Sequence, residues 1–487
     1  MRMKNPTVFI SAYRNVSIRY ILYSRILDYL KNKDLRIVVF LKDGDLDYYR
    51  DKLRYPNIIF EPVRLKQSMT YLRSSIGIYL NLIRVFMYGS EGSFKNNSPE
   101  VWKIQYDKEF LTANVINKIK YRIVRLLACL GNHSLLLRSI LVYIESKLFN
   151  GKIYDLYFEK YHPGLLIVSS TGYMIDPFIM RSAKRNNCKI LSILHSWDNP
   201  TCKPYRGCNP DFVVAWSEIM KRELNIFQDI SENKIYVGGV AHWDVYFNGA
   251  SKKNSRSVFV KNHSFDESRK IIFYAASAPK TFRKTFEIVE YILNEISNNR
   301  LVISSQLLVR LHPFYLSKGK NGKGQIVDIY RKRIEKIKSK FGDLVSFSLP
   351  EVNILTDDVD LPIEDIQNLG EILSHSDLLL TEYSTLMIEG SIFNVPVINV
   401  ALHKFRDTDK PVSVLENLNH IRRVIDTGAT RQVYDYDQLI NQINTYLMNP
   451  DLDRENRERL VKQEINTNRG NAGESIGRFI YSLIGTG

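Results

Sequence analysis

Continuous apolar runs separated by helical segments are the feature that most restricts how this chain can fold. The runs lack the polar alternation of a strand with one face in water. Such runs are typical of strands buried on both faces of a parallel sheet. In the first half they lie at 7–12, 35–41, 57–63, 165–171, 189–195, 212–216 and 234–239. The strand–helix rhythm predicts a doubly wound sheet.

A second series of the same kind fills the other half of the chain. Its runs lie at 270–277, 307–313, 344–349 and 377–383, with a last run ending at Val400. The stretch at 248–268 between the two series is polar and weakly patterned, which predicts an interdomain linker. The fold class is therefore α/β, with two doubly wound Rossmann-like domains.

The domain boundaries follow from these patterns. We predict an N-terminal domain over 1–250 with a helical insertion at about 65–150, and a C-terminal domain over 268–470. An amphipathic helix over 471–487 is expected to pack back toward the N-terminal domain. Ligands of such sheets bind outside the carboxyl ends of the strands. The site is therefore expected in a central cleft that the two domains face.

The charge and the cysteines narrow the classes of partner. The chain has 68 Lys and Arg against 52 Asp and Glu, a net charge of +16. This balance favours anionic partners, although a solvated basic surface explains it equally well. Nucleic acid is disfavoured, because the chain shows no helix-turn-helix, RRM, KH or zinc pattern. The four cysteines form no CxxC pair and are interpreted as reduced structural thiols.

The sequence also bears on location. It contains no run of about 18 apolar residues and no signal-peptide pattern at its start, so a cytoplasmic protein is expected. The helical stretch at 117–149 has one acid, Glu145, against the cations Lys118, Lys120, Arg122, Arg125, Arg138 and Lys147. A basic amphipathic surface of this kind can lie on the inner face of an anionic membrane. The alternative is a core helix pair with a solvated basic face.

Polar side chains follow three apolar strands of the C-terminal series. Candidate donor-binding residues are Ser277, Lys280, Arg310, His312, Glu382, Ser384, Thr385 and Glu389. Arg and His donate to phosphate, hydroxyls at a helix start favour an anion, and Glu389 can accept from ribose hydroxyls. An N-cap serine or an ion-paired arginine gives the same pattern. The conjunction at three strand ends favours a nucleotide-phosphate site without a Walker lysine loop or GxGxxG.

The loop after the run at 189–195 contains the candidates for acid–base chemistry. His195 and Asp198 are both of a type that can take a proton from an acceptor hydroxyl. Lys203, with Arg14 and Asn15 after the first strand, is a candidate for binding the acceptor. Asp198 can equally be a turn former. His242 and Asp244, further along, are interpreted as structural.

Three stretches carry a resemblance to a known family: "LHSWDNPTCK", "VRLHP" and "LLLTEYSTLMIEGSIFNVPVI". They resemble the GT-B fold enzymes related to CDP-glycerol glycerophosphotransferases, the teichoic acid polymerases, and similar capsule and surface-polysaccharide glycosyltransferases. The family pattern is His-Gly-Thr-Pro-Leu-Lys, Arg-x-His-Pro and Asp-Tyr-Ser-Ser. This chain keeps His195, Lys203, Arg310 and His312 but changes the residues after His195. The change makes a sugar donor at least as well favoured as glycerophosphate.

The resemblance implies an activity and roles for residues. It implies an inverting, metal-independent transferase, without a cofactor, that moves a sugar or polyol phosphate from a nucleotide-activated donor to a polysaccharide or lipid-linked acceptor. His195 would be the base, and the donor phosphates would be held by Arg310, His312, Ser384 and Thr385. No Asp-x-Asp is interpreted as a metal motif, so no metal is expected. The alternatives are a non-hydrolysing nucleotide-sugar 2-epimerase and, ranked lower, a nucleic-acid-binding protein.

Overall fold

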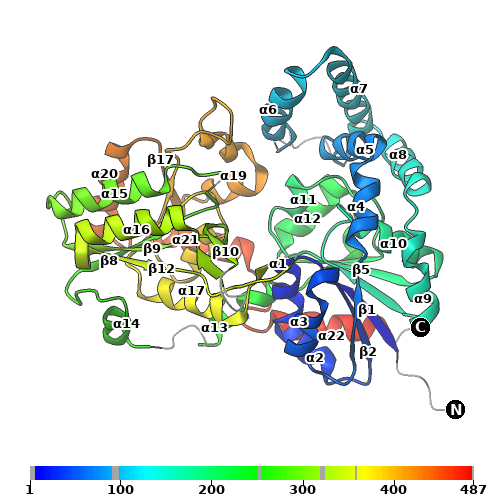
Figure 1. Ribbon diagram of the computed structural model, residues 1–487, viewed down its shortest axis with the longest axis horizontal. Coiled ribbons are helices and arrows are strands. Elements are labelled where there is room, and N and C mark those ends of the chain that lie inside the picture. The colour runs from blue at the N-terminus through cyan, green and yellow to red at the C-terminus, as the bar shows by residue number, and fades with distance from the viewer. Residues whose placement is uncertain are drawn as a thin grey trace. The chain divides into compact units, whose positions relative to one another are not determined.

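The computed structural model describes residues 6–89, 98–249, 254–279, 281–318, 324–356 and 359–484. The chain divides into two compact units, each built on its own parallel sheet (Figure 1). Unit 1 contains 1–244, 355–358 and 465–487, and unit 2 contains 245–354 and 359–464. The predicted α/β class is confirmed.

Unit 1 has a seven-stranded sheet in the order β3-β2-β1-β4-β5-β6-β7, and every pairing is parallel. Its strands are β1 (Thr7–Ser11), β2 (Arg36–Leu41), β3 (Ile58–Pro62), β4 (Leu165–Val168), β5 (Lys189–Ile193), β6 (Phe212–Ala215) and β7 (Ile235–Val237). They are almost entirely buried, because helices cover both faces as the continuous apolar runs predict. The strand order reverses between β1 and β4, which marks the place where a doubly wound sheet binds its ligand.

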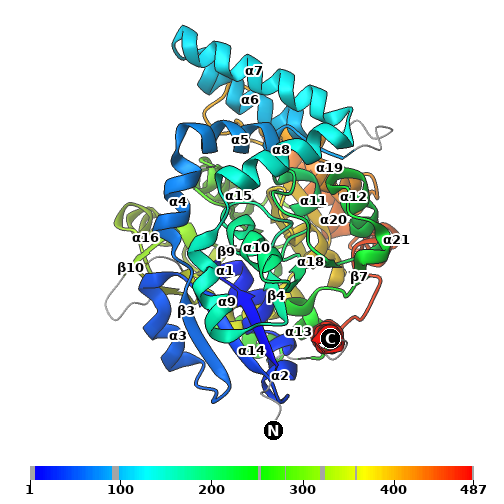
Figure 2. The same ribbon diagram turned by 90° about the vertical axis from the view of Figure 1, so that its right-hand side faces the viewer.

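The helices of unit 1 fall into two groups. Those around the sheet are α1 (Asn15–Ser17), α2 (Arg25–Lys31), α3 (Leu46–Lys52), α9 (Asp155–Tyr161), α10 (Asp176–Arg185), α11 (Asn199–Cys202), α12 (Glu218–Gln228) and α22 (Ala472–Ile484). The insertion between β3 and β4 contains α4 (Leu65–Arg73), α5 (Ser75–Val85), α6 (Ser98–Leu111), α7 (Val115–Asn132) and α8 (Leu135–Leu148). Figure 2 shows α7 and α8 side by side, and they contact each other.

The C-terminal helix α22 lies against α2, near the other end of the sequence (Figure 1). A Cβ on Gly477 would come within 2.8 Å of the Tyr29 side chain, so the absence of a side chain there permits the close approach. Asp244 accepts the N–H groups of Ala472 and Gly473, each at 2.8 Å, and so caps the start of α22. The structural interpretation of Asp244 agrees with this contact.

Unit 2 has a six-stranded parallel sheet in the order β12-β9-β8-β15-β16-β17. Its strands are β8 (Lys270–Ala275), β9 (Ser305–Arg310), β12 (Val345–Ser348), β15 (Leu378–Thr381), β16 (Val397–Val400) and β17 (Thr430–Val433). Two short antiparallel pairs are β10 (Leu316–Lys318) with β11 (Gly324–Ile326), and β13 (Asn353–Ile354) with β14 (Val359–Asp360). The order of the large sheet reverses between β8 and β15.

The helices that surround this sheet begin just after the boundary between the units, which α13 (Asp244–Phe247) crosses. They are α14 (Arg256–Asn262), α15 (Thr285–Ser297), α16 (Asp328–Phe341), α17 (Ile363–His375), α18 (Leu386–Ile392), α19 (Asn419–Ile425), α20 (Tyr436–Met448) and α21 (Arg454–Glu464). The apolar faces of α15, α16 and α20 meet the strands in one continuous core.

Three details differ from the predicted elements. The segment predicted as a linker contains α14, which buries Phe259 and Val260. The helix predicted near 18–30 is interrupted around Ser24, whose hydroxyl caps α2 by accepting the N–H of Ile26 at 3.2 Å. The strand β17 was missed, because its sequence Thr-Arg-Gln-Val is short and half polar, as an edge strand allows.

Candidate functional site

The reversal of strand order in unit 1 places Arg14, which follows β1, beside the loop that follows β4. Its Nη1 donates to the hydroxyl of Tyr173 at 2.7 Å, and the guanidinium lies 4.8 Å from the centre of the Tyr173 ring. The stacking and the hydrogen bond fix the cation at the carboxyl edge of the sheet. Arg14 therefore lies where a ligand of this sheet is expected.

His195, directly after β5, is buried at the same edge. Its Nδ1 lies 2.5 Å from the backbone carbonyl oxygen of Ser169. Only a protonated nitrogen can donate to a carbonyl, so Nδ1 carries the proton and Nε2 carries a lone pair. Burial, and then the charge of Arg14, lowers the pKa of His195 to about 3. The imidazole is therefore neutral at pH 7 and has the tautomer of a general base.

Asp198 and Lys203 form an ion pair in the same loop. Lys203 Nζ lies 2.6 Å from Oδ2 of Asp198, and the Ser196 hydroxyl donates to Oδ1 at 2.5 Å. Burial disfavours the charged form of Lys203, but the attraction of Asp198 outweighs it, and the pKa of Lys203 is raised. A carboxylate with two such donors is a poor base. Asp198 therefore holds Lys203 in place.

Asn15 begins the short helix α1 next to Arg14. Its Oδ1 accepts the N–H of Val16 at 2.7 Å. The side chain is half-buried, so its predicted contact with an acceptor stays a prediction.

Asp176 at the start of α10 is a site residue that the sequence analysis missed. It is completely buried and accepts hydrogen bonds from the hydroxyls of Ser11, at 3.4 Å, and Ser170. Burial raises the pKa of Asp176 to about 6, although the Ser170 hydrogen bond and the charge of Arg14 act in the opposite direction. In the sequence, Asp176-Pro177 is indistinguishable from an ordinary helix start.

Several buried polar atoms at this edge of the sheet have no hydrogen-bond partner in the described part of the chain. They are Tyr13 Oη after β1, Thr171 Oγ1 after β4, both amide atoms of Asn199 after β5, and His242 Nδ1 after β7. Buried polar groups are almost always paired, with protein or with water. Four loops that leave such groups open mark a place where polar ligand atoms or water bind.

We predict that Asp176→Asn stabilises unit 1 at neutral and alkaline pH. The folded-state pKa of about 6 lies above the ordinary 3.8. The carboxyl is therefore protonated in both states at low pH, and the penalty for burying it builds up as the pH rises from 3.8 to about 6 and is complete above that. The difference between the two pKa values corresponds to about 3 kcal/mol in the free energy of unfolding. Denaturant unfolding followed at pH 8 and pH 4 should show a gain of about 2–3 kcal/mol at pH 8 and little at pH 4.

The control for this prediction is Asp47→Asn on α3, whose side chain is 93% exposed. Its effect should not depend on pH in this way. An Asp176→Asn gain of equal size at both pH values, or none at either, would contradict the assignment of a buried, costly carboxylate.

In unit 2, Glu382 follows β15 and is buried by its own contacts. Its Oε1 accepts from the Tyr274 hydroxyl at 2.6 Å and lies 2.9 Å from His403 Nε2, and its Oε2 accepts the N–H of Ser277 at 3.0 Å. With these three internal partners, Glu382 has little capacity left to bind the nucleotide-activated donor substrate. The structure therefore corrects the role of Glu382, which holds the Ser277 loop in place. Lys280 in that loop lies outside the described residues.

The turn Glu-Tyr-Ser-Thr brings the chain from β15 into α18. Tyr383 has a φ of +48°, which reverses the backbone sharply. Ser384 Oγ accepts the N–H of Leu386 at 3.3 Å and lies 2.8 Å from Thr381 Oγ1. When the Thr381 hydroxyl donates to Ser384 Oγ, that oxygen accepts two hydrogen bonds. The hydroxyl proton of Ser384 is then available to a ligand.

Thr385 is oriented differently from Ser384. Its hydroxyl donates to Oε1 of Glu389 at 2.7 Å, and Oε2 of Glu389 accepts from the Tyr246 hydroxyl at 2.6 Å. The proton of Thr385 is therefore not available to a phosphate. These contacts correct the roles of Thr385 and Glu389: they stabilise the first turn of α18 and its contact with Tyr246.

His312, after β9, is half-buried and presents a hydrogen-bond donor. Its Nδ1 accepts the backbone N–H of Phe314 at 3.1 Å, so the proton of the neutral ring lies on Nε2. Burial lowers the pKa of His312 to about 4, which keeps the ring neutral at pH 7. A fixed Nε2–H group suits a phosphate oxygen.

Arg310, two residues earlier, is buried and already paired. Its Nη2 forms an ion pair with Asp365, and its Nη1 donates to Ser348 Oγ at 3.1 Å. This is the alternative that the sequence analysis left open for this residue. Arg310 connects β9 to β12 and α17, and its contact with a phosphate stays a prediction.

No group of three or more His, Cys, Asp or Glu side chains in the described ranges is arranged to hold a metal ion. None of the helices described has the length and apolar character that crossing a membrane requires.

Comparison with known proteins identifies the class of fold. No protein-family model and no curated protein sequence matches the chain. The S. aureus MnaA–UDP co-structure is 11% identical, with a TM-score of 0.52 and coverage of 99% of this chain and 97% of that one. The UDP-GlcNAc 2-epimerase from Neisseria meningitidis bound to UDP-GlcNAc is 13% identical, with a TM-score of 0.50 and coverage of 99% and 100%.

The wall teichoic acid polymerase TagF also matches, at 11% identity, a TM-score of 0.48 and coverage of 99% of this chain and 89% of that one. This score is too low to bear on function. Identities of this size establish the fold alone. The chain is a two-domain α/β protein of the GT-B type, which confirms the predicted resemblance at the level of the fold.

Proposed function

We propose that this protein is a transferase that moves a sugar or a polyol phosphate from a nucleotide-activated donor to a hydroxyl of a polysaccharide or lipid-linked acceptor. The observation that carries the proposal is His195. Its Nδ1–H donates to a backbone carbonyl, which leaves the Nε2 lone pair as the proton acceptor. A base held in one tautomer at the ligand edge of the sheet suits removal of a hydroxyl proton.

In the proposed reaction each residue has one task. The acceptor hydroxyl gives its proton to Nε2 of His195, and its oxygen forms a bond to the activated carbon or phosphorus of the donor. The bond from that atom to the nucleotide phosphate oxygen breaks, and the nucleotide leaves with the electron pair. Attack on carbon from the opposite side inverts its configuration. In unit 2, His312 Nε2–H and the Ser384 hydroxyl would donate to the phosphate.

The cations of unit 1 would hold an anionic acceptor. Arg14 and Lys203 both act on His195 through their charge, which places them near its imidazole. A phosphate-bearing acceptor would therefore bind close to the base. The same contact would offset part of the charge that lowers the pKa of His195, so binding would make the base stronger.

Nucleotide binding tests the proposal. Thermal-shift and calorimetric titrations with CMP, CDP, UDP, GDP and ADP should show selective stabilisation by one base. UDP is the first to test, since the two proteins of similar fold hold UDP or UDP-GlcNAc. His312→Ala should weaken that nucleotide about tenfold, because a hydrogen bond to a charged group contributes about 1.5 kcal/mol.

The matched control is His133→Ala, an exposed histidine at the end of α7, which should leave nucleotide affinity unchanged. A wild-type chain that binds none of the five nucleotides contradicts the proposed function. Equal loss in both variants contradicts the role of His312.

A second candidate is a nucleotide-sugar 2-epimerase. Asp176 favours it, because a buried carboxyl with a pKa of about 6 can exchange a proton near pH 7. An epimerase needs no acceptor and releases no nucleotide. Incubation with the nucleotide sugar alone separates the two: a new sugar epimer selects this candidate, whereas acceptor-dependent nucleotide release selects the transferase.

A further inference from the structure

The outer surfaces of α7 and α8 expose an unusual number of large apolar side chains. Their exposed fractions range from 37% to 69%. On α7 they are Val115, Ile116, Ile119, Ile123, Leu126, Leu127 and Leu130, and on α8 they are Leu135, Leu136, Leu137, Ile140, Tyr143, Ile144 and Leu148. We call these fourteen residues the apolar face of the insertion. A contiguous patch of this kind marks an interaction surface.

The apolar face is separate from the side of α7 that contacts the rest of unit 1. Tyr121, Val124 and Ala128 lie on the buried side, in one cluster with residues of α5. The exposed residues Ile119, Ile123, Leu126 and Leu130 recur at the spacing of one helical face. The insertion therefore packs against the rest of unit 1 through its buried side, and the residues of the apolar face are not part of the core.

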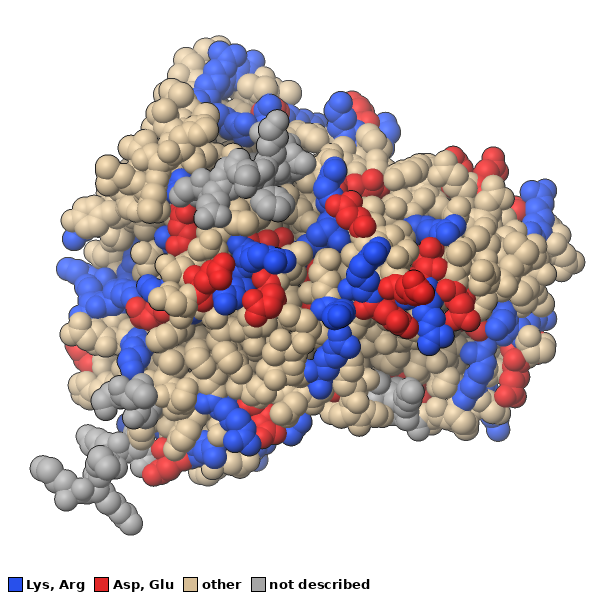
Figure 3. Space-filling model, turned by 180° about the vertical axis from the view of Figure 1, so that it is seen from behind, with Lys and Arg blue, Asp and Glu red and all other residues tan. Residues whose placement is uncertain are grey.

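The charges on these two helices have a single sign at the surface. The exposed or half-buried charged side chains are Lys118, Lys120, Arg122, Arg125 and Lys147. The one acid, Glu145, is buried and lies 2.9 Å from Nε of Arg84. Figure 3 shows this lobe at the upper left, where blue Lys and Arg side chains lie among uncharged ones. An apolar surface bordered by cations complements an anionic lipid surface.

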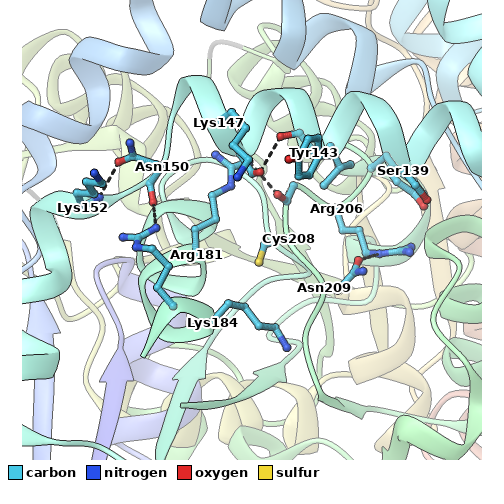
Figure 4. A pocket seen from close by; sticks show the side chains of 15 residues that line it. Ser139, Tyr143, Lys147, Asn150, Lys152, Arg181, Lys184, Arg206, Cys208 and Asn209 are labelled. Atoms are coloured by element: carbon cyan, nitrogen blue, oxygen red, sulfur yellow. Dashed lines mark hydrogen bonds between the residues drawn. The ribbon is translucent and has the colours of Figure 1, made fainter. Parts of the chain in front are cut away.

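A cationic cavity of about 670 Å³ lies between α8, α10 and the loop at 205–209. Its walls contain Lys147, Lys152, Arg181, Lys184, Arg185 and Arg206, and no acid (Figure 4). Lys184 and Arg185 are paired with acids outside the walls, but no ion pair of Lys147 or Lys152 is found within the described ranges. Tyr143 and Lys147 border both the cavity and the apolar face, so the cavity lies directly beside it.

The charge decides which occupant fits the apolar face. A second copy of this chain would bring the same cations together and would be opposed by repulsion. A nucleic acid would match the charge but not the apolar side chains. A bilayer with anionic phospholipids matches both, because its acyl region accepts the apolar side chains and its phosphates pair with the cations.

We propose that α7 and α8 dock unit 1 on an anionic bilayer, with the apolar face entering the lipid and phosphate headgroups occupying the cationic cavity beside α8. This docking does not depend on the proposed transferase activity. A protein without any nucleotide binding could still show it, and a nucleotide-binding protein could lack it.

Co-sedimentation with vesicles tests the proposal, using the full chain and vesicles of phosphatidylglycerol or of phosphatidylcholine. The wild-type chain should partition onto phosphatidylglycerol, and less at high salt. Ile123→Glu with Leu126→Glu should weaken partitioning about tenfold or more. Lys147→Gln with Lys152→Gln, which removes two cations of the cavity walls, should weaken it about 25-fold, since each cation near an anionic surface contributes about fivefold.

Matched controls come from α16 in unit 2. Ile329→Glu places a charge on a side chain that is 64% exposed, and Lys332→Gln with Lys336→Gln removes two exposed cations. These variants should bind vesicles like the wild type. All substituted positions are exposed, so thermal unfolding should be unchanged.

Three results would overturn the docking proposal. One is a wild-type chain that does not sediment with phosphatidylglycerol, or sediments equally with phosphatidylcholine. Another is equal weakening by the α16 controls. The third is a dimer, seen by light scattering, that Ile123→Glu with Leu126→Glu converts to a monomer without any effect on vesicle binding.

Discussion

Replacing His195 with Asn should reduce transfer about 10²- to 10⁴-fold, the usual contribution of a positioned general base. The Asn amide can still donate to the Ser169 carbonyl, so the buried contact on the Nδ1 side is kept. What is lost is the Nε2 lone pair. Steady-state kinetics should therefore show a lower kcat with little change in nucleotide affinity or in unfolding temperature.

The matched control is His162→Asn. His162 is exposed and has a φ of +47°, a backbone conformation that Asn tolerates well. Activity should be unchanged. If His195→Asn loses less than about fivefold, the proton has another acceptor and the proposed assignment of the base is wrong.

The pH dependence of kcat/KM is a second test of the role of His195. Because kcat/KM reports the free enzyme, its dependence on His195 should follow the pKa of about 3 of the unliganded chain. The neutral base is then fully present above about pH 4, and this group adds no loss of activity between pH 7 and pH 5. A loss centred at the ordinary histidine value, absent in His195→Asn, would contradict the buried, neutral imidazole.

The sequence predicted the two sheets well because burial on both faces leaves a direct pattern. A strand buried on both faces, such as β4 with its sequence Leu-Leu-Ile-Val, needs apolar side chains at every position, and such runs are rare outside parallel sheets. The residues at strand ends could be found for the same reason. Once a strand is placed, the next few residues lie at its carboxyl edge, as His195 and His312 do.

The partners of those residues could not be predicted, because they come from distant parts of the chain. Arg310 pairs with Asp365, and Glu382 binds Tyr274 and the N–H of Ser277. A strand-end Arg or Glu has the same sequence pattern whether it binds a ligand or an internal partner. Hydroxyls show the same limit: Thr385 donates to Glu389, whereas the neighbouring Ser384 shares a hydrogen bond with Thr381 in which either hydroxyl can donate.

In α8, helical periodicity alone did not show which charged side chains are buried. Arg138 and Glu145 read as members of an exposed charged face, yet both are buried. Arg138 binds Asp229, and Glu145 lies against Arg84 and Arg181. These pairs fasten α8 to the rest of unit 1, so the remaining exposed charges of α7 and α8 are cationic.

Arg138→Met should therefore loosen α8 by about 3–5 kcal/mol, the cost of leaving one partner of a buried ion pair alone. Arg138 is completely buried: Nε lies 2.8 Å from Oδ2 of Asp229, Nη2 lies 3.2 Å from Oδ1, and Nη1 donates to the Gly131 carbonyl at 2.6 Å. The Met side chain fills much of the volume of the Arg138 side chain but forms none of these polar contacts. Hydrogen exchange of the amides at 134–149 measures the local opening free energy directly.

A second substitution separates the charge from the packing. Asp229 has a φ of +47°, which Asn adopts readily, so Asp229→Asn removes the charge without strain. In Arg138→Met with Asp229→Asn no unpaired carboxylate remains, and the loss should be smaller than the sum of the two single losses by about 1–3 kcal/mol. As a control, Arg454→Ala breaks only exposed pairs and should cost less than about 1 kcal/mol. Strictly additive losses would mean that Arg138 acts through its hydrogen bonds to the α7 carbonyls, and that the ion pair contributes little to holding α8.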